Sequence, residues 1–236
     1  MSSIATIRAT GESAVRVTGT TGDRERDWVL VHKIARAITG NGIEGIITAI
    51  PTYESVLVEF DARVTSSAAV QAVIIALLGD VDLDAPLLEN PRTFVVPVLY
   101  DGEDLADVAA LTGLTEEQVV DAHSAPTYVI RCLGAPGGSP MLDGPRLPVP
   151  VPRLKSPRIH VPQGAVSLAG RQATITPAAA PGGWMLIGNT PLTVLDLTAE
   201  RLVPYEPGDL LRFERIDADR FAELRGIRLA PSEGVA

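Results

Sequence analysis

The sequence predicts an α+β fold in two parts, and three observations support this. Strand-like runs alternate with helical patterns over the first part of the chain. The segment 133–164 holds eight of the 19 prolines and five of the 21 glycines, so regular helix is excluded there. Short β-rich runs between Gly, Pro and Asn turns follow it, a pattern typical of a closed β-barrel or sandwich. We therefore expect an α+β domain over 1–90 and a β-barrel domain over 91–236.

The N-terminal part begins with a strand, a helix and a second strand. Ala14–Thr18 and Ile43–Ile50 are rich in β-forming residues, and the segment 28–38 between them has helical periodicity. Apolar residues spaced three and four apart define one face of this helix, which is the face we expect to be buried. They are Leu30, Val31, Ile34 and Ile38.

A further strand and helix complete this unit. Ser55–Phe60 alternates apolar and polar residues and forms a hairpin with the preceding strand, and 70–78 matches the spacing of an amphipathic helix. Thr93–Leu99 supplies another strand. The resulting order, β-α-β-β-α-β, is that of a ferredoxin-like unit. The acidic, proline-containing segment 79–92 has no clean period and is interpreted as a linker or an excursion.

A capped helix and a series of strands follow. The Thr115 hydroxyl is placed to accept the amide of Gln118, whose side chain can reach back, so a helix begins there and ends near His123. An apolar strand covers 128–133. The remaining expected strands are 165–169, 173–176, 184–187, 193–197 and 210–213.

Composition and charge exclude several functional classes. The formal net charge of −9 repels polyanions, and no basic cluster interleaved with aromatics offsets it, so nucleic acid is not an expected partner. The single cysteine, Cys132, forms no internal disulfide, and no Cys/His spacing predicts a metal site. The N-terminus lacks a signal pattern, and no run is long enough to span a membrane. We expect a cytoplasmic protein.

Histidine and cysteine offer few candidates for catalysis. His123 ends a helix before Ser124-Ala125-Pro126, where the helix C-terminus favours its protonated form and a loop can expose it. His32 lies on the amphipathic helix and is expected at the surface or boundary, and His160 is expected to be exposed on a strand. Cys132 is expected to be a buried small hydrophobe rather than a nucleophile.

Two arginines and two glycines are candidates for binding. Arg153 and Arg158 each follow a proline, which fixes the backbone before them, so two oriented guanidiniums are available for a carboxylate or phosphate. Two exposed loop arginines remain the alternative interpretation. Gly182-Gly183, before Trp184, is interpreted as the tight turn of a hairpin, with a substrate pocket as the alternative.

Several motifs together resemble one known family. Pro181 to Pro191 reads PGGWMLIGNTP, and 156–166 reads SPRIHVPQGAV. Gly11-Glu12-Ser13-Ala14 is similar to the family's GDSA opening, and 205–213, YEPGDLLRF, is similar to its PGDxVRF ending. The chain is thus identified as a member of the family of prokaryotic 5-oxoprolinase B subunits. This family is also called allophanate hydrolase subunit 1, or carboxyltransferase subdomains C and D.

The resemblance carries expectations about fold, activity and partners. It implies a ferredoxin-like N-terminal domain followed by a cyclophilin-like β-barrel. It also implies a homologous C subunit and an A subunit, which together use ATP to open 5-oxo-L-proline, a small-molecule amide, to L-glutamate. The alternatives within the family are a carboxyltransferase or allophanate hydrolase subunit of urea-type metabolism and a non-catalytic inhibitor of a histidine kinase.

The resemblance also implies roles for individual residues. His123 is expected to carry protons, Arg153 and Arg158 to hold an anionic group, and Gln172 to fix the amide. The backbone amides of Gly182 and Gly183 add anion contacts. No ATP-binding motif is visible in the chain, and no metal is expected.

The chain departs from the family pattern in one loop that we expect to shape the pocket. Where the family has the aromatic-rich GFxPGFxYL, this chain has LGAPGGSPML over 133–142, which retains Pro-Gly and loses every aromatic ring. The family's GQTGIYP likewise becomes RQATITP over 171–177, which retains Gln172. These changes predict a pocket that differs from that of the family.

Overall fold

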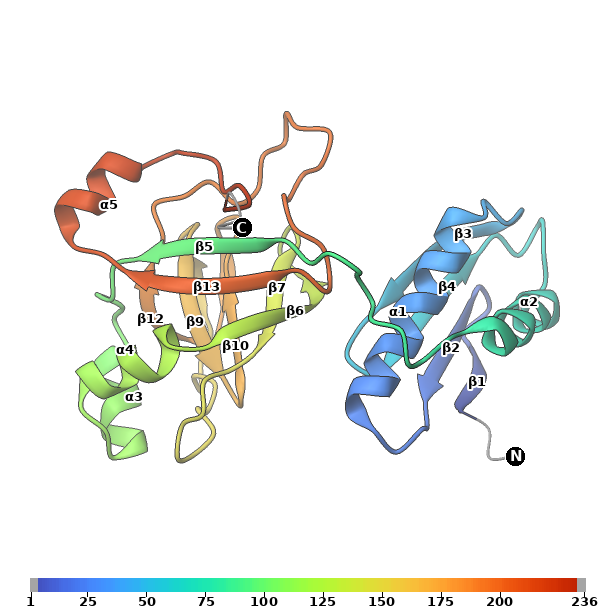
Figure 1. The fold of residues 1–236 in the computed structure, drawn as a ribbon, viewed down its shortest axis with the longest axis horizontal. Helices are drawn as coiled ribbons and strands as arrows, with labels where there is room; N and C mark the ends of the chain where they lie inside the picture. The colour runs from blue at the N-terminus through green and yellow to red at the C-terminus, as the bar shows by residue number, and fades with distance from the viewer. Residues whose placement is uncertain (1–3, 233–236) are drawn as a thin grey trace. The chain divides into compact units, whose positions relative to one another are not determined.

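The computed structural model describes residues 4–232 and contains two compact units, Met1–Glu89 and Asn90–Ala236 (Figure 1). Each has its own hydrophobic core. The predicted α+β class is confirmed, because both units combine helices with antiparallel or mixed sheets. Within the described residues, no helix is both long enough and apolar enough to cross a bilayer.

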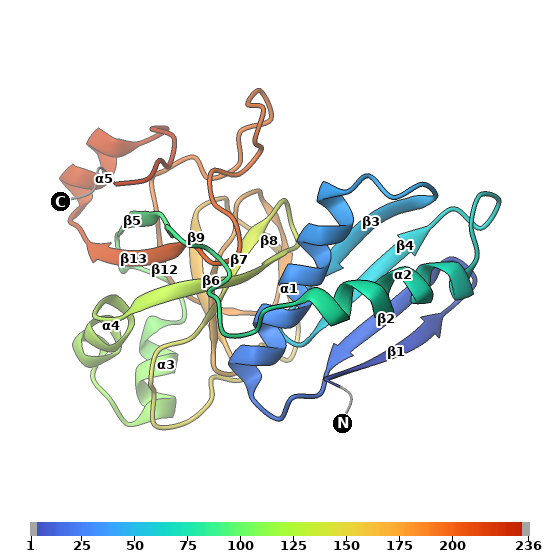
Figure 2. The same cartoon turned by 45° about the vertical axis from the view of Figure 1, so that its right-hand side comes forward.

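The first unit is a four-stranded antiparallel sheet with two helices on one face (Figure 2). Alternate strand residues such as Val15, Val17, Val56 and Val58 are fully buried beneath the helices. The face predicted for the first helix is buried as expected. The strand order is β1-β2-β4-β3. The elements are β1 (Ala5–Thr10), β2 (Ala14–Gly19), α1 (Arg24–Gly40), β3 (Ile46–Pro51), β4 (Ser55–Phe60) and α2 (Ser67–Asp80).

The strand expected to close this unit belongs to the other unit. β5 (Thr93–Val98) forms as predicted, but it pairs in parallel with β13 (Leu210–Arg215), and its Phe94 and Val96 are fully buried in the second core. The edge position beside β2 is taken by β1, which the sequence pattern did not reveal. Local periodicity predicts that a strand exists, whereas its pairing depends on residues far away in the chain.

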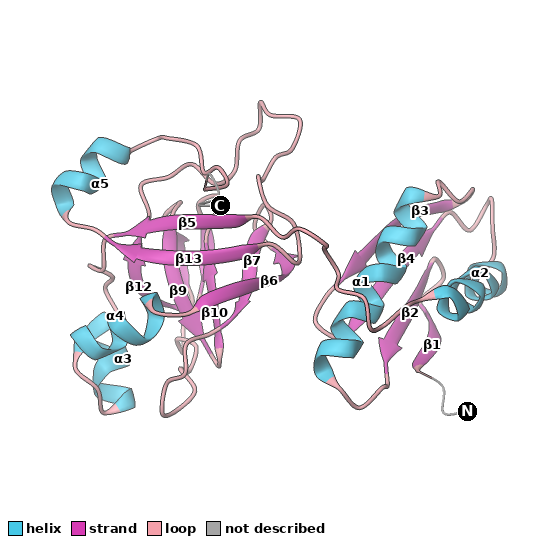
Figure 3. Ribbon diagram, in the orientation of Figure 1, coloured by secondary structure: helices cyan, strands magenta, loops and turns pink. Residues whose placement is uncertain are grey.

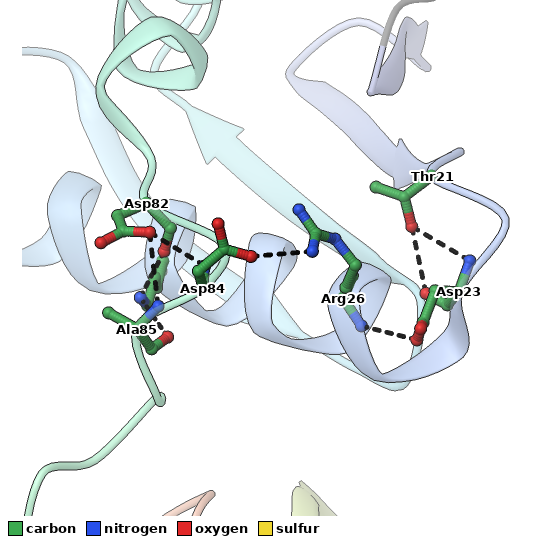
Figure 4. Close-up of polar contacts among 7 residues, drawn as sticks. Thr21, Asp23, Arg26, Asp82, Asp84 and Ala85 are labelled. Atoms are coloured by element: carbon green, nitrogen blue, oxygen red, sulfur yellow. Dashed lines mark hydrogen bonds and ion pairs between the residues drawn. The ribbon is translucent and has the colours of Figure 1, made fainter.

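In the segment 79–92, which is expected to be a linker or an excursion, residues 82–85 are hydrogen-bonded to side chains of α1 (Figure 4). The Arg26 guanidinium lies 2.8 Å from the Asp84 carboxylate. Lys33 donates to the carbonyl oxygens of Asp82 and Ala85 at 2.6 and 2.7 Å. The Asp82 carboxylate accepts the backbone N–H groups of Asp84 and Ala85, which lowers its pKa.

The second unit is built on a curled seven-stranded sheet of order β12-β9-β10-β7-β6-β13-β5 (Figure 3). Leu99, which follows edge strand β5, and Asn189, the last residue of edge strand β12, exchange backbone hydrogen bonds of 3.0 and 2.9 Å, so the sheet curls back on itself like a barrel. A separate pair, β11-β8, lies outside this sheet. Its elements after β5 are α3 (Leu105–Thr112), α4 (Glu116–Ser124), β6 (Thr127–Gly134), β7 (Ser139–Asp143), β8 (Arg158–Val161), β9 (Ala165–Ala169), β10 (Gln172–Ile175), β11 (Ala180–Gly182), β12 (Met185–Asn189), β13 and α5 (Ala218–Leu224).

Helix α4 begins as predicted, whereas two expectations for the segment 182–197 fail. The Thr115 hydroxyl accepts from the Gln118 amide at 3.2 Å, and the Gln118 side chain accepts from the Thr115 N–H at 2.9 Å, which confirms the capping box. The strand expected over 193–197 does not form, because only Thr193 makes an isolated bridge, to Arg228. Gly182-Gly183 is not a hairpin turn: β11 pairs with β8, β12 pairs with β9, and neither glycine has a positive φ.

Candidate functional site

The second unit contains a cavity of about 630 Å³ beside the end of β12, a size suited to a small ligand. Its lining combines segments that are distant in sequence. Asp101, Gly102 and Glu103 follow β5, while Asn189 and Thr190 belong to the PGGWMLIGNTP run. The family-like sequence motif therefore forms a wall of this cavity.

Close backbone contacts set the shape of that wall. A Cβ atom on Gly188 would lie 2.6 Å from the Leu99 carbonyl oxygen, so only glycine fits there. Gly164 has a φ of +84° and its N–H donates to the Thr176 carbonyl, while the Thr190 N–H donates to the Gly164 carbonyl at 2.9 Å. The Asn189 side-chain amide donates to the Gln163 carbonyl at 3.3 Å. These bonds hold the cavity wall at Asn189 and Thr190 against the turn at Gly164.

Arg158 lies behind this wall and is engaged by acids. Its Nη2 lies 2.7 Å from the Asp104 carboxylate and 3.4 Å from that of Glu103, and the Asp104 hydrogen bond raises the Arg158 pKa. Asp104 is buried and also accepts the Leu186 N–H at 2.6 Å. Asp104 and Arg158 thus fix the segment before α3 to β12, rather than presenting a free cation to a ligand.

Three of the other predicted binding residues lie close to Arg158, whereas Gln172 belongs to the seven-stranded sheet. Gly182 pairs with Arg158, and the Gly183 carbonyl accepts the Leu154 N–H at 2.7 Å next to exposed Arg153. Gln172 of β10 pairs with Ala169 of β9, one residue from the Leu168–Met185 pair of β9 and β12. The register therefore brings Gln172 and residues 183–184 toward the same end of β9 from its two sides. The predicted functions of these residues stay predictions.

His123 occupies an environment opposite to the expected one. Its side chain is fully buried, its ring lies 4.2 Å from that of Phe213, and Tyr100 shares a 2.8 Å hydrogen bond with Nδ1. Burial lowers the His123 pKa to about 3, so the expectation of a protonated, loop-exposed imidazole is wrong. Within residues 4–232 its Nε2 has no hydrogen-bond partner. The helix end faces the core here because Tyr128 and Phe213 cover it.

The remaining histidines and the cysteine are divided between core and surface. His32 is buried, against expectation, since its ring packs on Trp28 and its Nε2 lies 3.1 Å from the Thr52 carbonyl. His160 is exposed on β8, as predicted. Cys132 is buried and its thiol pKa is raised to about 11 by that burial, which agrees with a packing role. Across the described residues, no group of three or more His, Cys, Asp or Glu is arranged to hold a metal ion.

The sequence interpretation missed the polar side chains that line the cavity. Asn189 and Thr190 lie in the PGGWMLIGNTP motif, but the sequence interpretation assigned binding only to its glycines, Gly182 and Gly183. Asp101 and Arg225 stand in segments with no motif. Only the folded chain brings them together.

Comparison with known proteins agrees with this architecture. Residues 5–205 match the model of the carboxyltransferase domain, subdomain C and D, so the chain belongs to that family. It is 32% identical over 221 residues to the 5-oxoprolinase B subunit of Bacillus subtilis (strain 168), covering 89% of this chain and 92% of that protein. The chain is therefore related, over nearly its whole length, to a hydrolase subunit.

Solved structures extend the likeness to larger chains. The crystal structure of TTHA0988 is 30% identical with a TM-score of 0.74, over 90% of this chain and only 40% of that one. Urea carboxylase of Kluyveromyces lactis has a TM-score of 0.70 at 15% identity, over 95% of this chain and 23% of that one, which shows a shared fold. The same module is thus found both as a separate subunit and as part of longer proteins.

Proposed function

We propose that this chain is the B subunit of an ATP-dependent 5-oxoprolinase-type amide hydrolase that opens 5-oxo-L-proline to L-glutamate. The observation that carries the proposal is the 32% identity across 92% of the Bacillus subtilis 5-oxoprolinase B subunit. The cavity beside β12 supports it, because its volume suits a small amide and family-motif residues line it.

The chemistry explains why further subunits and ATP are part of the proposal. A lactam is resonance-stabilised, so opening it requires activation of its oxygen together with a proton for the leaving nitrogen. ATP supplies the activation when it is bound by the complex, and we assign no nucleotide site to this chain. In the proposal, a homologous C subunit and an A subunit complete the active complex.

Residues of this chain bind and orient the amide in the proposed reaction. Asn189 and Thr190 border the cavity, and we assign to them the polar contacts with the amide. Arg158 acts as a positioning residue through Asp104, which accepts the Leu186 N–H of the cavity wall. Arg153 remains a candidate for an anionic group at the rim, and Gln172 for the amide. Proton transfer by His123 stays a prediction, and the neutral, buried imidazole shares a hydrogen bond at Nδ1 with the partly buried Tyr100.

The test is reconstitution of the complex. The chain is co-expressed with the C-subunit and A-subunit homologues from the same source, and ATP hydrolysis is measured with and without 5-oxo-L-proline. Oxoproline-dependent hydrolysis with glutamate release supports the proposal. His123→Gln tests proton transfer in the same assay: activity equal to the wild type removes His123 from the chemistry.

The same assay separates the alternatives. Activity with urea in place of 5-oxo-L-proline would assign the chain to urea-type metabolism, the setting of the structurally similar urea carboxylase. Inactivity with both amides, together with inhibition of a histidine kinase's autophosphorylation, would favour the regulatory alternative and contradict the proposed function.

A further inference from the structure

The cavity has a cationic side that comes from the end of the chain. Phe221, within α5 (red in Figure 1), and Arg225, which caps the C-terminal end of that helix, line the cavity together with the family-motif segment. The guanidinium carbon of Arg225 lies 5.5 Å from the centre of the Phe221 ring, a cation–π contact that restricts its orientation. The matched family region ends at residue 205, so this side of the cavity is supplied from outside it.

Backbone hydrogen bonds fix the cationic side to the motif. The Gly226 N–H donates to the Pro191 carbonyl at 3.0 Å, and the Thr193 N–H donates to the Ile227 carbonyl at 2.8 Å. The Leu229 N–H donates back to the Thr193 carbonyl at 3.0 Å. Because these bonds fix the residues that directly follow Arg225, its Cα is held beside the Asn189-Thr190 wall.

Within residues 4–232, Arg225 differs from its basic neighbours in having no acidic partner. Arg220 is paired with Glu223 at 2.8 Å, Arg215 with Glu117, and Arg228 with Asp196 at 3.3 Å. Among the residues that the structure describes, Arg225 contacts no carboxylate. A guanidinium that lines a cavity without such a partner is available to bind an anionic ligand group with two parallel hydrogen bonds.

Acidic side chains lie elsewhere on the cavity lining. Glu103 and Asp101 both line it, and Glu103 is partly compensated by Arg158 at 3.4 Å. Asp101 therefore remains as an acceptor for an N–H group. The cavity thus offers a donor for a carboxylate and an acceptor for an amide or amine nitrogen.

We propose that Arg225 is the residue that binds the carboxylate of the substrate and selects small amides that carry one. The ligand class is a compact amide with a carboxylate toward Arg225 and an N–H toward Asp101. This inference rests on the proposed function and specifies it, since 5-oxo-L-proline has both groups. Arg225 acts in recognition rather than in bond cleavage.

The experiment compares two lactams that differ only in the carboxylate. Isothermal titration calorimetry on the co-expressed complex measures Kd for 5-oxo-L-proline and for 2-pyrrolidinone, the same ring without the acid. In the Arg225→Gln variant, affinity for 5-oxo-L-proline falls by about 10–100-fold, the loss expected for a charged hydrogen-bonded pair, while 2-pyrrolidinone binding is unchanged. Arg225→Lys, which keeps the charge but not the fork, restores part of the affinity.

Arg220→Gln is the matched control, because Arg220 lies on α5, the helix that Arg225 caps, and is paired with Glu223 instead. It leaves both affinities unchanged. Equal binding of 5-oxo-L-proline by the wild type and Arg225→Gln overturns the inference, as does equal weakening of both lactams or failure of the wild type to bind 5-oxo-L-proline. ATP hydrolysis, measured in parallel, tests the proposed function separately: carboxylate-selective binding without turnover contradicts that function and leaves the role of Arg225 intact.

Discussion

Two polar regions of the second unit differ in their access to solvent and ligands. Around His123, the rings of Tyr100, Tyr128 and Phe213 enclose an imidazole that is fully buried. In the cavity, Arg225 and Asp101 are exposed. Enclosure makes a polar group part of the core and keeps it neutral, whereas exposure leaves its charge available to a ligand. The histidine resembles a catalytic residue in sequence, but the cavity has the accessible chemistry.

Truncating the enclosed histidine gives the largest expected effect on stability. His123→Ala removes the ring packed on Phe213 and the hydrogen bond with Tyr100, and lowers the free energy of unfolding by about 2–4 kcal/mol. Urea denaturation measures this loss. His160→Ala, at an exposed strand position, changes the free energy of unfolding by less than about 0.5 kcal/mol. Similar effects at both sites would show that the His123 region is not a packed core.

The ion pair behind the cavity gives the next largest effect. Asp104→Ala leaves Arg158 and the Leu186 N–H without their buried acceptor, and costs about 2–3 kcal/mol in the same measurement. Glu103 also contacts Arg158, but its side chain is 72% exposed, so Glu103→Ala has little effect on stability. Unchanged stability in the Asp104→Ala variant would remove the structural role given to Arg158.

The burial of His123 makes the free energy of unfolding depend on pH. Its pKa is near 6.5 in the unfolded chain and about 3 in the folded one, so the unfolded state takes up a proton first as the pH falls. The stability that depends on neutral His123 is complete above pH 6.5 and is lost as the pH falls from 6.5 toward 3. The His123→Gln variant has no titrating group at this position, so its free energy of unfolding falls less steeply than that of the wild type between pH 7 and 5. Parallel pH dependences would contradict a buried, neutral imidazole.

The smallest effect concerns the helix that carries His123. Thr115→Ala removes the side-chain cap of α4 and lowers the free energy of unfolding by about 1 kcal/mol. Thr115→Ser retains the hydroxyl and serves as the control. Loss of equal size in both variants would show that the contribution does not come from the cap.

Local patterns in the sequence predicted most elements and the β3-β4 hairpin, but not the pairing of strands that are distant in sequence. Spacing of apolar residues located α1, β4 and α2, and Thr115 with Gln118 located the start of α4. The same reasoning placed Thr93–Val98 in the wrong sheet. Pairing depends on long-range contacts that a window of sequence does not contain.

The candidate site was less predictable than the fold. The motif around Asn189 was found, but burial of His123 depends on Phe213, which is 90 residues away, and Arg225 becomes a cavity residue only through the contacts of 226–229 with 191–193. A residue type and its immediate neighbours do not reveal either environment. Access to solvent, which decides between core and site, is a property of the assembled unit.

The most direct test of the account locates the bound ligand. The ¹⁵N-labelled chain, in complex with unlabelled partner subunits, is titrated with 5-oxo-L-proline while its amide resonances are recorded by NMR. If the cavity is the site, the amides of Asn189 and Gly226 shift in a saturable manner, and those of His123 and Phe213 do not. Shifts confined to His123 and Phe213, or no shift in either region, would contradict the assignment of the cavity as the ligand site.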